Sequence, residues 1–66
     1  MDKRHKSLIQ KINKEKIPTL NIGLITNKDG SPKFFEVIVE RGYRYTYPEV
    51  LKKIPKVFFG IKVKTF

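Results

Sequence analysis

The sequence predicts an α+β domain with a small antiparallel sheet of three or four strands, a short N-terminal helix and a second short helix before the last strand. Three observations support this class. A segment with helical spacing of apolar residues comes first, two alternating segments joined by a turn signal follow, and another alternating segment ends the chain. With 66 residues, the chain has room for one domain, which we expect to span residues 1–66.

The first predicted element is a helix over about residues 8–16. Ser7 and Gln10 have the spacing of a capping box, in which each side chain bonds a backbone amide of the first turn. Pro18 ends the helix. Residues 1–6 carry cations where a helix N-terminus favours anions, so we expect a mobile basic arm there, with His5 exposed to solvent. The apolar stripe of the helix consists of Leu8, Ile9 and Ile12.

Two strands are predicted next, over residues 19–26 and 33–41. The intervening Asn-Lys-Asp-Gly sequence is typical of a four-residue hairpin loop, because Gly30 readily takes a positive φ. Pairing that places apolar residues opposite one another fixes the expected register. The expected partners are Thr26 with Ser31, Ile22 with Phe35, and Leu20 with Val37.

The remainder of the chain predicts a short strand over residues 43–47, a helix that begins at Pro48 and ends before Pro55, and a final strand over residues 56–64. The alternation of the final strand divides its side chains between two faces. The expected core side comprises Val57, Phe59, Ile61 and Val63. The expected opposite face comprises Lys56, Phe58, Gly60, Lys62, Lys64 and Phe66.

Positive charge is concentrated at the two ends of the chain. The formal net charge is +9 and the pI is about 10.1. Residues 1–16 contain six Lys or Arg and two acidic residues, residues 17–51 contain four of each, and residues 52–66 contain five lysines and no acid. Two unopposed basic blocks favour a polyanionic partner. We therefore expect the two blocks to converge in the fold into one continuous basic patch.

The sequence favours a small nucleic-acid-binding protein that contacts mainly phosphates, with weak sequence specificity. Lysines bind phosphates, and an aromatic ring among them offers a stacking surface for a base. Arg44, between two tyrosines, is a candidate for a specific anion contact. The candidate DNA- or RNA-binding residues are Lys3, Arg4, Lys6, Lys11, Lys14, Arg44, Lys56, Phe58, Lys62 and Lys64.

Other interpretations of the same residues stay open. The lysines also suit an edge strand kept soluble by charge, with Phe58 covered by the N-terminal helix or by a second subunit. The charge equally fits a small inhibitor or modulator that docks on an acidic protein, with Tyr43, Tyr45, Phe58 and Phe66 as anchors. A homodimer is compatible with each of these functions, because the expected core is small and one sheet edge is open.

The sequence gives little support to an enzyme. It has no Cys and a single His, and its four glycines stand singly rather than in a phosphate-binding loop. Glu36 and Glu40 lie four residues apart on one expected strand, about 13 Å along it, which is too far for an acid–base pair. We expect no catalytic residue, metal or cofactor. The absence of a long apolar run predicts no membrane span, and we expect a cytoplasmic, intracellular protein.

Overall fold

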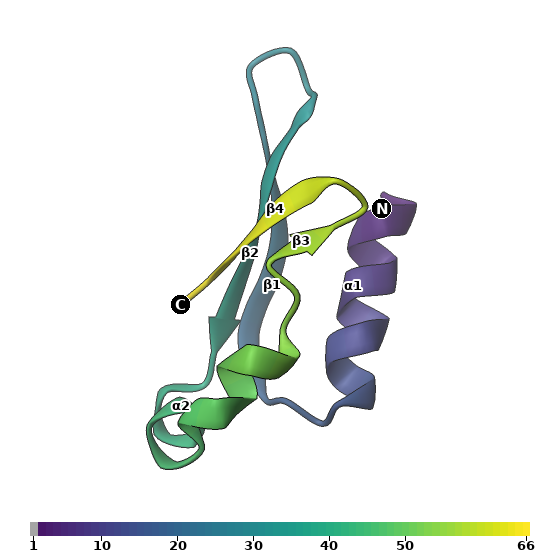
Figure 1. Ribbon diagram of the computed structural model, residues 1–66. Coiled ribbons are helices and arrows are strands. Elements are labelled where there is room, and N and C mark those ends of the chain that lie inside the picture. The colour runs from purple at the N-terminus through teal and green to yellow at the C-terminus, as the bar shows by residue number, and fades with distance from the viewer. Residues whose placement is uncertain (1) are drawn as a thin grey trace.

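A computed structural model describes residues 2–66 and contains a four-stranded sheet with the N-terminal helix beside it (Figure 1). The elements are α1 (Lys3–Lys14), β1 (Thr19–Thr26), β2 (Pro32–Val39), α2 (Arg41–Thr46), the 3-10 helix η1 (Pro48–Lys53), β3 (Val57–Phe58) and β4 (Ile61–Thr65). The strand order is β1-β2-β4-β3. The predicted α+β class is confirmed. The sheet is mixed rather than wholly antiparallel, because α2 and η1 carry the chain back so that β4 runs parallel to β2.

Helix α1 begins five residues before its predicted start. The Asp2 carboxylate accepts a hydrogen bond from the Arg4 backbone N–H at 2.8 Å, which caps the helix, and also pairs with the Arg4 guanidinium. These bonds from Arg4 hold the pKa of the Asp2 carboxyl well below its usual range. The predicted capping box at Ser7 is therefore wrong, and the expected arm at residues 1–6 is instead helical from Lys3. Met1, also assigned to that arm, lies outside the described residues.

His5 ties α1 to β1. Its ring is half-buried, and Nε2 donates a hydrogen bond to the backbone carbonyl of Ile22. The imidazole also lies beside Phe35, with ring centroids 6.4 Å apart. The expectation that His5 is exposed to solvent is wrong, because the first turn of α1 holds it against the sheet.

The predicted β1–β2 hairpin is present, but its register differs from the expected one. Ile22 lies opposite Val37 rather than Phe35, and Leu24 lies opposite Phe35. The shift is two residues, so the inward-facing residues of β2 stay inward. An irregularity between Ile25 and Thr26 contributes to the change. A second one between Thr19 and Asn21 lies at Leu20, which is 71% exposed rather than in the core.

The expected last strand is divided by a tight turn. Phe59 has φ 52° and Gly60 has φ 73°, and a pair of positive φ angles is what a two-residue hairpin turn requires. The turn folds β3 back on β4, so Phe58 lies opposite Ile61. The predicted alternation is therefore inverted before the turn: Val57 and Phe59 are exposed.

The expected third strand at residues 43–47 is instead the short helix α2. The Glu40 carboxylate accepts hydrogen bonds from the backbone N–H groups of Gly42 at 2.9 Å and Tyr43 at 2.6 Å. This cap begins a helical turn, and Tyr43 and Tyr47 then lie one turn apart with their rings 5.1 Å apart. The predicted helix after Pro48 is present as η1, which buries Val50.

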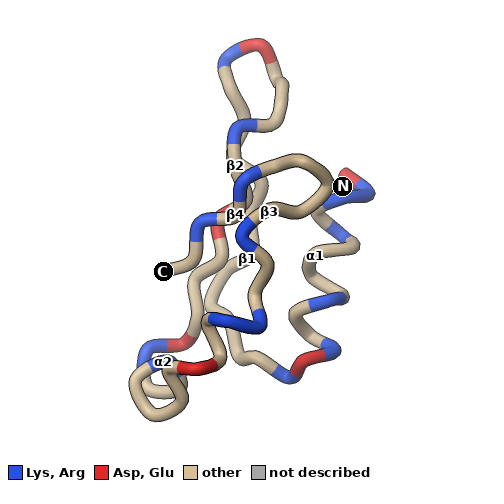
Figure 2. Tube along the Cα trace, viewed as in Figure 1, with Lys and Arg blue, Asp and Glu red and all other residues tan. Residues whose placement is uncertain are grey.

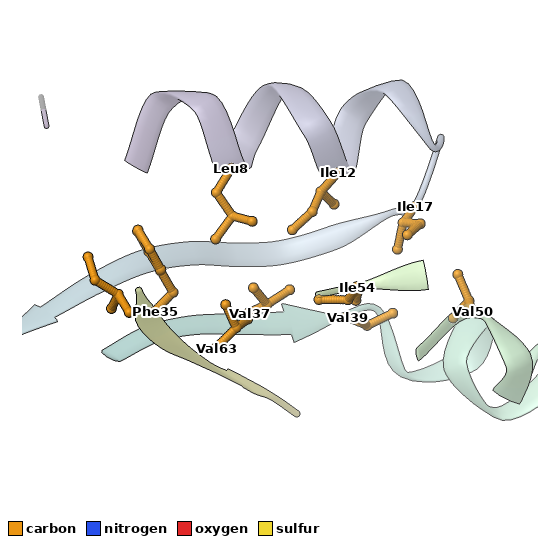
Figure 3. Close-up of a cluster of buried hydrophobic side chains, with 10 residues drawn as sticks. Leu8, Ile12, Ile17, Phe35, Val37, Val39, Val50, Ile54 and Val63 are labelled. Atoms are coloured by element: carbon orange, nitrogen blue, oxygen red, sulfur yellow. The ribbon is translucent and has the colours of Figure 1, made fainter. Parts of the chain in front are cut away.

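The hydrophobic core lies between the helices and one face of the sheet. Leu8 and Ile12 point from α1 toward Phe35 and Val37 of β2 (Figure 3). These four are the largest fully buried side chains. The remaining core residues are Ile17, Val39, Val50, Ile54, Ile61 and Val63. Within residues 2–66, no helix combines the length and the apolar character needed to cross a membrane.

Two leucines provide a matched test of this core. Leu8 is fully buried and Leu20 is 71% exposed. We expect Leu8→Ala to lower the free energy of unfolding by about 2–5 kcal/mol, because it removes buried methyl groups and leaves a cavity. Leu20→Ala is expected to change it by no more than about 0.5 kcal/mol. Urea denaturation followed by circular dichroism measures both, and equal effects of the two changes would contradict the described β1.

The Glu40 cap predicts a dependence of stability on pH. Hydrogen bonds from the Gly42 and Tyr43 backbone amides hold the pKa of Glu40 below its ordinary value. A lowered pKa in the folded state stabilises the fold above the unfolded pKa of about 4.3, and this contribution disappears as the pH falls through the folded value. We expect Glu40→Gln to make the melting temperature fall less between pH 5 and pH 3, as thermal melts would show. Glu49→Gln, with the same change of charge on an exposed side chain of η1, should keep the wild-type pH dependence.

Candidate nucleic-acid interface

Six of the predicted basic residues lie on two surfaces, four on α1 and two on β4 (Figure 2). The first, which we call the helix surface, consists of Lys3, Lys6, Lys11 and Lys14. All four side chains are exposed on α1, whose opposite side is buried against the sheet through Leu8. Residues 3–14 contain no Asp or Glu. The helix surface thus spreads four cations over about 17 Å along the exposed side of one rigid element.

The helix surface carries an electrostatic cost in the isolated protein. Lys3 lies three residues before Lys6, and Lys11 lies three residues before Lys14, so each pair projects like charges from one side of the helix. Lys11 and Lys14 lie in the last turn, where the helix dipole favours cations, but the first pair lies where it does not. An anion bound along α1 would relieve this repulsion.

Arg4 does not belong to the helix surface, although the sequence predicted it as a phosphate contact. Its guanidinium donates to both carboxylate oxygens of Asp2, at 3.0 Å and 2.8 Å. The same contact raises the pKa of Arg4. The cation is therefore neutralised within the chain, and the N-terminal block offers fewer unpaired charges than its composition suggests.

The second surface, which we call the sheet surface, is the face of the sheet opposite α1. It includes Ile25, Phe34, Glu36, Val57, Lys62, Lys64 and Phe66. Four of these residues form one row across all four strands, since each is the pairing partner of the next. That row, in order, is Ile25, Phe34, Lys62 and Val57. Val57 is 60% exposed, so this end of the row is open to solvent.

Lys64 connects the row to the rest of the sheet surface. Its ammonium lies 4.2 Å from the centroid of the Phe34 ring, within the range of a cation–π contact. Its pairing partner is Glu36, whose Oε1 lies 3.5 Å from the amide of Asn21. Phe66 extends the pairing by one step, because its N–H bonds the Val37 carbonyl at 2.8 Å. Its side chain is half exposed.

Phe58 is not on the sheet surface. It was expected to face away from the core, where it could stack on a base, and this expected orientation is wrong. It is half-buried and packs against the core, with its ring 6.1 Å from Phe35 in an edge contact. The tight turn at Phe59 turns it toward the core side occupied by Ile61. The alternative considered from sequence, that Phe58 is covered, describes its surroundings better.

The two basic blocks do not form one patch. Lys62 and Lys64 of the C-terminal block lie on the sheet surface, whereas the N-terminal lysines lie on α1, and the core separates them. Lys52 and Lys53 of the same block lie in η1, whose Val50 joins the core on the side of α1. Arg44 and Lys56 are exposed on α2 and directly before β3, outside both surfaces. The expectation of one continuous patch is therefore wrong. A 66-residue chain can cover one face of its sheet, and the last two lysines of the second basic block lie on the uncovered face.

Phe34 is the residue that the sequence analysis missed. Alternation along residues 34–39 turns Phe35, Val37 and Val39 inward and was sufficient to place Phe34 outward. Its position beside Lys62 could not be predicted from this alternation. That contact depends on the parallel pairing of β2 with β4, and these strands are more than twenty residues apart in the chain.

The described residues offer no enclosed site. Residues 2–66 form no pocket, and they contain no group of three His, Cys, Asp or Glu side chains placed to hold a metal ion. Comparison of the chain with protein-family models, curated proteins and solved structures found no match. The candidate interface is accordingly described by its own geometry alone.

Two phenylalanines test where the aromatic side chains lie. Phe58→Ala removes a ring packed on the core, and we expect it to lower the free energy of unfolding by about 2–3 kcal/mol. Phe66→Ala removes a half-exposed ring at the end of the sheet and should cost about 1 kcal/mol or less. Chemical denaturation of both variants provides the comparison. If Phe58→Ala left the free energy of unfolding unchanged, the position of Phe58 against the core would be contradicted.

Proposed function

We propose that this protein binds nucleic acid through the phosphate backbone, with the helix surface as the main contact. The observation that carries the proposal is the set of four exposed lysines along α1, in a helix that contains no acidic residue. Nucleic acids present closely spaced phosphates, and several cations along the exposed side of a rigid helix can contact such an array of charge. The proposed contacts are Lys3, Lys6, Lys11 and Lys14.

The proposed binding is weakly dependent on sequence. Lysine ammonium groups act as mobile point charges and contact phosphates without reading base edges. If four phosphates are neutralised on duplex DNA, the logarithm of the binding constant should fall against the logarithm of salt concentration with a slope of about −3.6. The net charge of +9 would also accelerate the encounter with any polyanion.

Docking on an acidic protein is the second candidate function. Its support is the exposed aromatic and cationic group on α2, where Tyr45 is 89% exposed beside Arg44 and half-exposed Tyr47. Tyrosine and arginine are enriched among residues that dominate protein–protein binding energy. This candidate predicts a stoichiometric complex with an acidic protein after nuclease treatment, and loss of that complex in Tyr45→Ala.

The salt dependence of DNA binding tests the nucleic-acid proposal. Fluorescence anisotropy with a labelled 20-base-pair duplex should give a steep slope for the wild-type protein. The double variant K6Q/K14Q should reduce the slope by about 2, since two fewer phosphates release counterions. Gln preserves helix propensity, so α1 should remain folded.

The matched control is K28Q/K33Q, which removes the same charge outside α1. Lys28 lies in the β1–β2 loop and Lys33 at the start of β2, and both are exposed. This control should change the slope by less than half as much as K6Q/K14Q. A flat salt titration of the wild-type protein would contradict nucleic-acid binding, and equal effects of the two double variants would contradict the role of the helix surface.

A further inference from the structure

The sheet surface places an aromatic ring beside two lysines of β4, on a face that α1 and η1 leave uncovered. We propose that this face binds single-stranded nucleic acid, with a base stacked on Phe34 and the neighbouring phosphates on Lys62 and Lys64. This inference rests on the proposed function and adds a second, separate contact region to it. It also assigns the aromatic role to Phe34 rather than to Phe58.

The position of Phe34 suits a stacking platform. It lies in β2, one of the two central strands, so its ring is flanked by Ile25 of β1 and Lys62 of β4. Backbone pairing on both sides holds the strand rigid, and the apolar neighbour supports one edge of a base. Every nucleic-acid base has an aromatic face, so such a platform accepts bases with little selectivity.

The Lys64 ammonium occupies the Phe34 ring in the isolated protein, and a bound base would replace it there. In the isolated protein the Lys64 ammonium lies 4.2 Å from the ring centroid. Stacking of a base on an aromatic side chain is typically stronger than an exposed cation–π contact. An incoming base would therefore displace the ammonium from Phe34. The released ammonium then lies at the edge of the stacked base, where it can bind the adjacent phosphate.

A second ring extends the platform. The alternation of β4 places Phe66 on the same face as Lys64, next to Ile38 of β2. Four residues separate Ile38 from Phe34 along β2, a distance of about 13 Å. Lys64 thus lies between the half-buried ring of Phe34 and the half-exposed ring of Phe66. A chain of unpaired nucleotides running along β2 would meet a ring, a cation and a ring in turn.

The chemistry favours a single strand over a duplex. Bases within a duplex are stacked on one another, and an aromatic side chain on a flat sheet does not reach their faces. The sheet surface also has a small net charge, because Glu36 lies beside Lys64. Binding there should depend on stacking more than on phosphate neutralisation. With two phosphates contacted, its salt slope should be about −1.4, shallower than that of the helix surface.

The test compares single-stranded and duplex probes with aromatic variants. Labelled 15-nucleotide oligothymidine and oligouridine, and a 15-base-pair duplex, are titrated by anisotropy with the full chain. F34L keeps an apolar side chain in β2 but removes the ring, and should weaken binding to the single strands by about fivefold or more. Its affinity for the duplex should stay unchanged. F59L is the matched control, because Phe59 is exposed at the β3–β4 turn outside the sheet surface, and it should bind all probes like the wild type.

A second variant keeps the test decisive if F34L fails to fold. K62Q/K64Q alters only exposed side chains, and it should weaken single-strand binding by about tenfold at low salt. Wild-type affinity of K62Q/K64Q or of folded F34L for the single strands would overturn the inference. If K6Q/K14Q still loses duplex binding in that case, the proposed function stands without the inference. Absence of binding to every probe would overturn both.

Sedimentation equilibrium decides whether a second copy of the chain covers this face instead. The inference expects the oligomeric state to be the same for the wild type, F34L and K62Q/K64Q. A dimer that dissociates in F34L would overturn it, because the sheet surface would then be buried between subunits.

Discussion

The packing of α1 against β2 is the contact on which the rest of the structure depends. Leu8 and Ile12 meet Phe35 and Val37 there, and these are the largest fully buried side chains of the protein. A domain of this size has one small core, so nearly all of its burial energy comes from this layer. The layer covers one face of the sheet and leaves the other exposed. Which residues are available for binding follows from that division.

The same division explains how the chain tolerates its charge. Two unopposed basic blocks would repel each other if they met, and the fold places Lys62 and Lys64 on the face of the sheet opposite α1. Local contacts reduce the repulsion further. Asp2 neutralises Arg4 at the start of α1, and the Phe34 ring receives the Lys64 ammonium. The two surfaces therefore differ in chemistry: α1 presents charge alone, whereas the sheet presents charge together with aromatic and aliphatic side chains.

Local signals were reliable where the relevant contacts are short in sequence. The β1–β2 hairpin follows from alternation and from the turn at Gly30, and η1 follows from Pro48. Side-chain caps were harder to anticipate. Asp2 extends α1 toward the N-terminus, and Glu40 converts an expected strand into α2. Each carboxylate accepts hydrogen bonds from backbone N–H groups two or three residues later, and these bonds compete with strand pairing. The turn at Phe59 was missed because a bulky residue rarely adopts a positive φ.

The sequence by itself determined the α+β class, the hairpin, the basic character of both ends and the identity of most core residues, since periodicity and charge are properties of neighbouring residues. Only the tertiary structure decided that β4 pairs with β2 in parallel, that Phe58 faces the core and that Phe34 lies beside Lys62. These outcomes depend on contacts between segments more than twenty residues apart and on which face the single helical layer covers. No local pattern contains that information, because the entropy lost when distant segments come together is offset by the core as a whole.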